Sequence, residues 1–331
     1  MEEKEIIEKE IPLEELEKAT TPIKKIDYSY SRVDLYSQCK FKYKLKYIDK
    51  HYASFGNIAT MFGSLMHATE ESIANSIIEG KPIDYVGLKN NFIIELSKIK
   101  HKYPNEFYSI GKNGMTYYQK GYYYLEHGIY RLEKYMNEHP TCELVAAELD
   151  FNFDYDESHG FKGSIDRLIK DNSTNTYLVF DIKSYDEEMT NDKLTTPLQM
   201  VIYSEAVKRQ FNVDYDHIKC IYDLPLCDTY HNAGTKGFIE RGFEKINKLF
   251  RGIEDKDWKP TPSPLCHWCE FCPTNASTTD EFKYLCPYYS QWQSKGDRAN
   301  DVKFEWQGIE NHESVMQIYK VMLNKNKQEN V

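Results

Sequence analysis

The sequence predicts an α/β fold in which a helical segment precedes a β-sheet. Residues 60–138 contain few helix breakers and carry apolar residues at helical intervals. After His139-Pro140 the pattern changes to short apolar strands, and helical periodicity returns near 197–210 and 237–251. Because alternating strands and helices are typical of α/β proteins, we expect helices packed on one sheet.

The composition is that of a globular protein. The chain has 331 residues, of which 28% are charged and 40% hydrophobic, and this excludes wholesale disorder. No apolar run approaches the ~18 residues of a membrane helix, and residues 1–5 lack the basic start of a signal peptide. We therefore expect a cytoplasmic protein of a bacterial or phage-infected cell, without membrane association, whose eight cysteines form no disulfide framework. The net charge of −10 argues against bulk-charge binding of nucleic acid but leaves a local basic groove open.

The N-terminal part begins with an arm and then becomes ambiguous. Residues 1–25 are dominated by Glu and Lys, so we expect a mobile acidic arm. Ser29 and Ser31 are candidate helix N-caps. Residues 33–47 fit two periods, because lysine alternates with apolar residues as in a strand, while tyrosine and cysteine recur at the helical spacing. The N-cap candidates favour the helix.

The helical segment includes a tyrosine-rich stretch. Its apolar positions recur at helical intervals: Tyr122, Leu125, Ile129, Leu132 and Met136. We interpret the stretch as core and scaffold. The alternative, an aromatic stripe that stacks on nucleic-acid bases, stays open.

The C-terminal part carries the predicted strands. They are expected in four segments: 144–153, 161–169, 177–182 and 217–224. The polar cluster 171–176 predicts a hairpin between the second and third strands. Four of the eight cysteines fall within 260–290, and a short amphipathic helix is expected near 315–323 in the polar tail.

Two acidic residues and a lysine fall on neighbouring predicted strands. Asp181 and Lys183 share one strand face, and in a hairpin Asp166 lies beside them. Two carboxylates suit a hard divalent cation, which polarises a phosphodiester and lowers the pKa of an attacking water. The lysine would orient or stabilise that water. Alone, D-x-K is weak, since surface strands often alternate acid and base.

Two further pairs strengthen this interpretation. Gln199 and Tyr203 lie one helical turn apart on a single face. Gly63 precedes His67 by one turn, where elements can approach closely. A lone histidine of this kind is more often a satisfied polar group than a ligand, but the occurrence of all these pairs in this order is hard to explain by accident.

These residues resemble the RecB-like branch of the PD-(D/E)xK nuclease superfamily. Four motifs characterise that branch: G-x-x-x-H, G-x-x-D, D/E-x-K and Q-x-x-x-Y. They match Gly63/His67, Gly163/Asp166, Asp181/Lys183 and Gln199/Tyr203. The S-x-x-x-x-Y-x-x-C-x-x-x-Y segment that starts at Ser31 also resembles the branch's first helix, and the resemblance covers roughly residues 29–290.

The resemblance implies a restriction-endonuclease-like core with a central mixed sheet, a helical insertion and a cysteine-bound cap. It implies that Asp166, Asp181 and the carbonyl of Ile182 bind Mg²⁺ or Mn²⁺, with His67 as a further ligand. Glu148, in the strand before Asp166, is a weaker candidate for a carboxylate near the metal, and an exposed strand residue is an equally good interpretation of it.

The resemblance also implies roles beyond the metal. Lys183 would position or activate the attacking water, while Gln199 and Tyr203 would form the active-site wall and contact the substrate strand. The best candidates for phosphate contact are three lysines interleaved with aromatic residues: Lys40, Lys42 and Lys44. The alternative for these lysines is a solvated helix face.

The cysteines indicate a second metal site. C-x-x-C pairs usually bind zinc or an iron–sulfur cluster, and spacing alone favours zinc slightly. The resemblance reverses that preference, because iron–sulfur nucleases of this branch, AddB-type subunits and CRISPR-associated adaptation exonucleases among them, carry one cysteine before the histidine motif and three after Q-x-x-x-Y. It implies a [4Fe–4S] cluster on Cys39, Cys266, Cys269 and Cys286, with Cys272 as the alternative fourth ligand and zinc as the alternative metal.

We therefore predict a metal-dependent DNA nuclease, and specifically an exonuclease in DNA repair, recombination or phage DNA processing. A non-cutting binding subunit and an endonuclease of the same superfamily are the alternatives. The predicted division is an arm at 1–25, a nuclease domain at 26–290 and a tail at 291–331, the domain containing a helical insertion (60–140), a catalytic core (141–255) and a cysteine cap (260–290). The sequence contains no GxxxxGK[ST] motif, so any helicase or recombination partner would be a separate chain.

Overall fold

Two long strands form the base of the sheet. β2 (Cys142–Asp154) and β3 (His159–Asp171) pair antiparallel over nearly their whole lengths. The other edge of β3 is shared by β1 (Ile26–Tyr28), parallel to its start, and β4 (Thr176–Ile182), antiparallel to its end. On that edge neither strand pairs with residues 162–166. β3 therefore has an open stretch in its middle.

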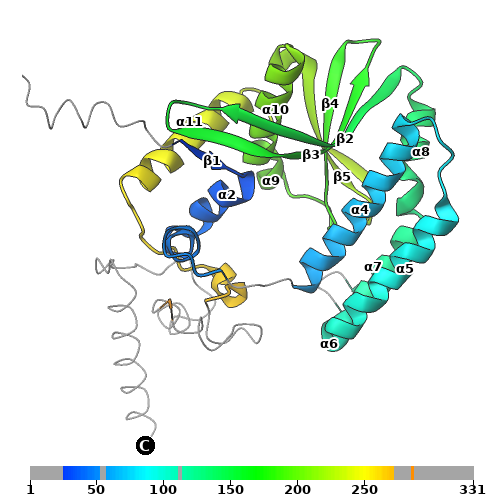
Figure 1. Cartoon of the computed structure of the whole chain (residues 1–331), viewed down its shortest axis with the longest axis horizontal. Coiled ribbons are helices and arrows are strands. Elements are labelled where there is room, and N and C mark those ends of the chain that lie inside the picture. The colour runs from blue at the N-terminus through cyan, green and yellow to red at the C-terminus, as the bar shows by residue number, and fades with distance from the viewer. Residues whose placement is uncertain (1–24, 53–56, 111–113, 272–284, 287–331) are drawn as a thin grey trace, which may run out of the picture.

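The remaining strands extend the sheet beyond β4. β5 (Ile218–Leu224) runs parallel to β4, and β6 (Thr229–Ala233) runs antiparallel to β5. The result is a six-stranded mixed sheet. This computed structural model describes residues 25–52, 57–110, 114–271 and 285–286 (Figure 1).

Helices cover both faces of the sheet (Figure 1). One face packs against α2 (Tyr30–Gln38), α10 (Leu198–Phe211) and α11 (Phe238–Glu254). The other face belongs to the core shared with α4 (Ile58–Ile78), α5 (Tyr85–Lys102), α7 (Tyr117–Glu126) and α8 (Arg131–Glu138). Alternate residues of β4 enter the two cores, so the strand is buried along its whole length, as its continuous apolar run predicts.

Short elements connect these pieces: α3 (Lys40–Tyr43), the π-helical turn η1 (Lys44–Ile48), α6 (Pro104–Phe107), η2 (Gly128–Tyr130), α9 (Asn191–Thr195), η3 (Tyr215–His217) and η4 (Pro264–Trp268).

Local sequence explains where the main helices begin and end. The side chain of Asn57 accepts a hydrogen bond from the backbone N–H of Thr60 and caps α4. Thr116 and Gln119 form a capping box at the start of α7. α10 ends at Asn212, whose left-handed backbone (φ 51°) terminates the helix.

The structure confirms the predicted α/β class, the mixed sheet, the four predicted strands and the hairpin between β3 and β4. It decides the ambiguous segment at 33–47 in favour of helix, but in pieces. Cys39 adopts an extended conformation (φ −157°) that ends α2 and starts α3, and its Sγ accepts a hydrogen bond from the backbone N–H of Lys42. Strands β1 and β6 were not predicted.

One predicted core position is wrong. Leu125, Ile129 and Leu132 are buried as expected, but Tyr122 is 44% exposed. The predicted helix at 315–323, the tail and residues 1–24 of the arm lie outside the described residues, and the proposed domain limits stay a prediction. Among the helices that the structure describes, none has the length and apolar character needed to span a membrane.

Candidate active site

The candidate site lies where β4 separates from β3. The last paired residues are Arg167 on β3 and Phe180 on β4. Asp166 and Asp181 are their neighbours on the unpaired side. Beyond that point the Asp166 carboxylate replaces the strand, because its Oδ2 accepts a 2.6 Å hydrogen bond from the backbone N–H of Ile182. The open stretch of β3 thus leaves room for this carboxylate, which is fixed against the end of β4.

A chain of polar contacts leads from Asp181 to α10. Lys183 Nζ lies 2.5 Å from Asp181 Oδ2 and donates a 3.1 Å hydrogen bond to Gln199 Oε1. The amide nitrogen of Gln199 in turn donates to the hydroxyl of Tyr203 at 2.8 Å. The lysine is therefore held from two sides, and its contact with Gln199 was not predicted from the sequence.

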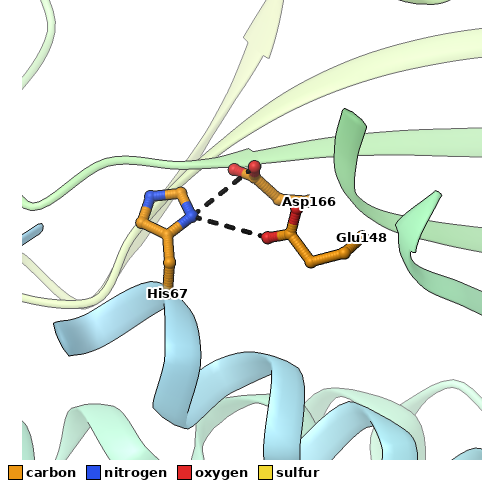
Figure 2. Close-up of side chains that lie close together, drawn as sticks. All are labelled: His67, Glu148 and Asp166. Carbon is orange, nitrogen blue, oxygen red and sulfur yellow. Dashed lines mark ion pairs between the residues drawn. The ribbon is translucent and has the colours of Figure 1, made fainter. Parts of the chain in front are cut away.

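His67 reaches this site from the opposite helical layer. Its Nδ1 lies 3.5 Å from Asp166 Oδ1 and 4.0 Å from Glu148 Oε1, as Figure 2 shows. Gly63 lies one turn earlier on α4, and a Cβ there would sit 3.3 Å from Ser184 Oγ. The glycine thus allows α4 to approach the segment that follows β4, as its position before His67 predicted.

Glu148, the weakest of the metal candidates in the sequence, lies beside His67 and Asp166 in the structure. Its backbone is left-handed (φ 46°) inside β2, which is uncommon for a residue with a side chain. Its Oε2 accepts a 2.8 Å hydrogen bond from the hydroxyl of Ser164. Strained backbone of this kind costs about 1–3 kcal/mol and gathers at functional sites.

Three of these side chains could hold a cation. One ligand atom each from His67, Glu148 and Asp166 lie within 4.8 Å of one another. An imidazole with carboxylate oxygens suits Mn²⁺, and the carboxylates suit Mg²⁺. Asp181 is not part of this group among the described residues. Its buried Oδ2, which makes no hydrogen bond of regular geometry there, faces Lys183 instead.

Burial and neighbouring charges shift the proton affinities in the site. Burial raises the pKa of Asp181 to about 6, with the charge of Asp166 adding to it and Lys183 opposing it. Burial lowers the pKa of Lys183, but the Asp181 carboxylate more than offsets this and the net pKa is raised. For His67, burial is likewise outweighed by Asp166, so its pKa is raised, and burial raises that of Glu148.

The geometry of the candidate site agrees with the protein family that the sequence matches. Residues 27–274 match the family model described as the PD-(D/E)XK nuclease superfamily. The chain belongs to this superfamily. Membership implies a hydrolase of phosphodiester bonds in DNA that typically uses divalent cations, and it agrees with the observed mixed sheet.

Two solved structures resemble this nuclease at low identity. One is a candidate exonuclease from Eubacterium rectale, with 12% identity, a TM-score of 0.41, and coverage of 73% of this chain and 86% of the other. The other is the protein SSO0001, with 14% identity, a TM-score of 0.29, and coverage of 72% and 96%. No curated protein matches the sequence.

A buried charge network behind the nuclease site was not predicted from the sequence. Arg167, next to Asp166, donates to Glu70 on α4 at 2.7 Å and to Asp223 on β5 at 3.1 Å. Arg131 on α8 donates to the same Asp223 at 3.0 Å. Only seven of the 42 basic residues are arginine. That rarity is a signal that could have marked these positions, since only arginine offers a planar set of donors for two carboxylates.

The network fixes the helix that carries His67. Glu70 lies one turn after His67 on α4, and it also accepts a 2.7 Å hydrogen bond from the hydroxyl of Tyr124. Arg167 therefore joins α4 to the strand that carries Asp166. The Arg167–Glu70 ion pair therefore fixes the position of His67 relative to Asp166.

The four cysteines predicted to bind a cluster line one cavity, close to the C-terminal end of α2. The cavity is lined by Cys39, Cys266, Cys269 and Cys286 and also by Phe41 and Phe271. The four thiols come from three separate segments, and four polar residues line the cavity with them: Gln38, Lys42, Thr261 and Ser263. Cys272, the alternative fourth ligand, lies outside the described residues.

The predicted phosphate contacts are all engaged within the chain. Lys40 pairs with Asp257, Lys42 pairs with Glu270 at 2.6 Å, and the buried Lys44 pairs with Asp49 at 2.7 Å. Binding of DNA by these lysines stays a prediction, and it would require these ion pairs to open.

Proposed function

We propose that this nuclease is an Mg²⁺- or Mn²⁺-dependent exonuclease that hydrolyses phosphodiester bonds in DNA. The observation that carries the proposal is the convergence of His67, Glu148 and Asp166 beside the Asp181–Lys183 pair. This set contains cation ligands and a fixed lysine, which are the two parts that metal-dependent phosphodiester hydrolysis requires. The exonuclease mode follows from the resemblance of Q-x-x-x-Y and the cysteine pattern to the RecB-like branch.

Each residue has a defined task in this proposal. His67, Asp166 and Glu148 would hold the cation, with Asp181 and the carbonyl of Ile182 completing its ligands. When bound, the cation polarises the scissile phosphate and lowers the pKa of the attacking water.

The polar chain around Lys183 would orient the water. Its Nζ is anchored by Asp181 and by Gln199 Oε1, so its remaining proton can face the attacking water. Gln199 is kept in place by Tyr203, and this pair would form the wall beside the substrate strand.

The test compares two DNA substrates. End-labelled linear DNA and covalently closed circular DNA are incubated with the protein over a range of Mg²⁺ and Mn²⁺ concentrations. We expect degradation of the linear substrate alone, with the label reporting the polarity. The matched control is Lys183→Met, which keeps an unbranched side chain as far as Cε and removes the charge and the donors.

The other outcomes select the alternatives. Cutting of the circle would identify an endonuclease of the same superfamily. Binding of DNA without any cutting would identify a non-cutting subunit. An exonuclease of this type would serve DNA repair, recombination or phage DNA processing, with a separate helicase or recombination partner supplying the strands.

We also propose that the cysteine cavity holds a [4Fe–4S] cluster with a mainly structural role. The four thiols come from the end of α2, the η4 turn and the segment at 285–286, so a cluster would clamp the N-terminal helix to the C-terminal part. Protein purified without oxygen should be brown and contain about four iron atoms per chain. Colourless protein with one zinc per chain would replace the cluster by zinc.

A further inference from the structure

Three exposed tyrosines form a row on the helical layer. Tyr108, Tyr118 and Tyr122 are 50%, 42% and 44% exposed. The ring centroids of Tyr108 and Tyr118 lie 6.1 Å apart, and those of Tyr118 and Tyr122 lie 4.6 Å apart. We call these three residues the tyrosine ladder.

The ladder is supported from beneath. The buried Phe107 contacts two of its rings, with centroid distances of 5.1 Å to Tyr108 and 6.3 Å to Tyr118. Tyr118 and Tyr122 are one turn apart on α7, and Gly121 on the inner side lies so close to α5 that a Cβ there would be 2.5 Å from Leu96. Close packing of the inner face therefore holds the two rings outward.

Positive charge lies beside the rings. The last turn of α5 carries Lys100, His101 and Lys102 in succession. Lys100 Nζ lies 5.4 Å from the ring centroid of Tyr108. An exposed aromatic row with a lysine beside it combines the two features by which proteins bind single-stranded nucleic acid: rings on which bases stack, and a cation for the phosphates.

Two residues of the ladder, Tyr118 and Tyr122, lie on α7, a helix that also contacts the candidate active site. On the inner face of α7, Lys120 pairs at 3.1 Å with Asp186, three residues after Lys183. Tyr117 packs on Phe62 of α4, and the two ring centroids lie 5.4 Å apart. Phe62 precedes Met66 and His67 by about one helical turn. A strand bound on the outer face of α7 would therefore be held by the helix that supports both catalytic segments.

We propose that the tyrosine ladder is a stacking platform for unpaired bases of single-stranded DNA. The proposal rests on the DNA nuclease function proposed above. Bases of a duplex are already stacked and paired, so the ladder binds single strands in preference to duplex. Lys100 beside the rings favours a polyanion over an apolar protein partner.

The test measures binding without cutting. Fluorescence anisotropy with a labelled oligodeoxythymidine and with a labelled duplex is recorded with Ca²⁺ in place of Mg²⁺. Base–aromatic stacking contributes about 1–3 kcal/mol per base, so Tyr118→Ala and Tyr122→Ala should each weaken single-strand binding by roughly 5- to 150-fold. Duplex binding should stay unchanged.

Three variants separate stacking from structural support. Tyr118→Phe keeps the ring and should bind as the wild type does, whereas Tyr118→Leu keeps apolar bulk without the ring and should show the loss. Tyr130→Ala is the matched control, because Tyr130 is 37% exposed and pairs with Tyr85 at the other end of α5, with ring centroids 4.6 Å apart. It should leave binding unchanged.

Two results would overturn the proposal: equal single-strand affinity in Tyr118→Leu and wild type, or a wild type that does not bind the oligonucleotide. Cutting of linear DNA in Mg²⁺ is measured on the same preparations. A wild type that binds single strands through the ladder without cutting would refute the nuclease activity and leave the ladder standing. The second result includes a wild type that binds a protein partner and has no affinity for the oligonucleotide.

Discussion

Replacing Arg167 by methionine tests whether the buried charge network holds the site together. The guanidinium is 1% exposed and is shared by Glu70 and Asp223. Methionine preserves most of the apolar volume of the side chain. It leaves Asp223 with Arg131, but it leaves Glu70 with only the Tyr124 hydroxyl among its described hydrogen-bond partners.

The expected cost follows from burial. Removing one partner of a buried ion pair leaves an uncompensated charge and costs about 3–5 kcal/mol. Glu70 is 2% exposed, and burial already raises its pKa, so the carboxylate can relieve the cost only by taking up a proton. The double variant Arg167→Met/Glu70→Met removes both charges and should recover much of the loss.

Urea unfolding monitored by circular dichroism measures this free energy. With a slope of about 3 kcal/mol per molar, the midpoint should fall by roughly 1–2 M. The control is Arg209→Met, whose partly exposed side chain pairs with Glu205 and should cost at most about 1 kcal/mol. A loss below about 1 kcal/mol for Arg167→Met would refute the reasoning, as would a double variant as unstable as the sum of its single variants.

Three further predictions concern the candidate cation site and the proposed cluster site. Asp181→Ala and Lys183→Ala should each lower cutting of end-labelled DNA at least about 10²-fold in protein that is still folded, as a native circular dichroism spectrum and a cooperative urea transition would show, and full activity in clean preparations would reject the assignment. The cation concentration needed for half-maximal cutting should rise as the pH falls from 8 to 6. The pKa of His67 is raised and that of Asp181 is about 6, so protons stay on groups that must lose them to bind a cation. A half-maximal cation concentration that does not change with pH would contradict this. Cys286→Ser should lose iron and visible absorbance, whereas Cys142→Ser, on β2, should keep both, and equal iron content would exclude Cys286 as a ligand.

The sequence predicted the parts of the site that depend on local spacing. Asp181 and Lys183 share a strand face because of the two-residue period, and Gln199 and Tyr203 share a helix face because of the helical period. The hairpin was predicted from its polar turn, and it brings Asp166 beside β4. The mixed order of the sheet came from the resemblance.

Features that depend on distant contacts could not be predicted in this way. Glu148 enters the site through a left-handed backbone inside a strand, which no periodicity encodes. Tyr122 follows the apolar spacing of its helix, yet it is exposed because Gly121 and Tyr124 take the inner face. The partners of Lys40 and Lys42 lie more than 200 residues later in the chain, so a basic run could not be distinguished from a set of internal ion pairs.

The cysteine cavity joins parts of the chain that a ribosome makes at different times. Cys39 and Cys286 are separated by roughly 250 residues, and both line the same cavity. At about 5–20 residues per second, a ribosome needs about 12–50 s to make the chain between them. Cys39 is therefore made well before the last cysteine that lines the cavity with it. The cluster proposed for this cavity, which needs all four thiols, could assemble only after Cys286 has been made.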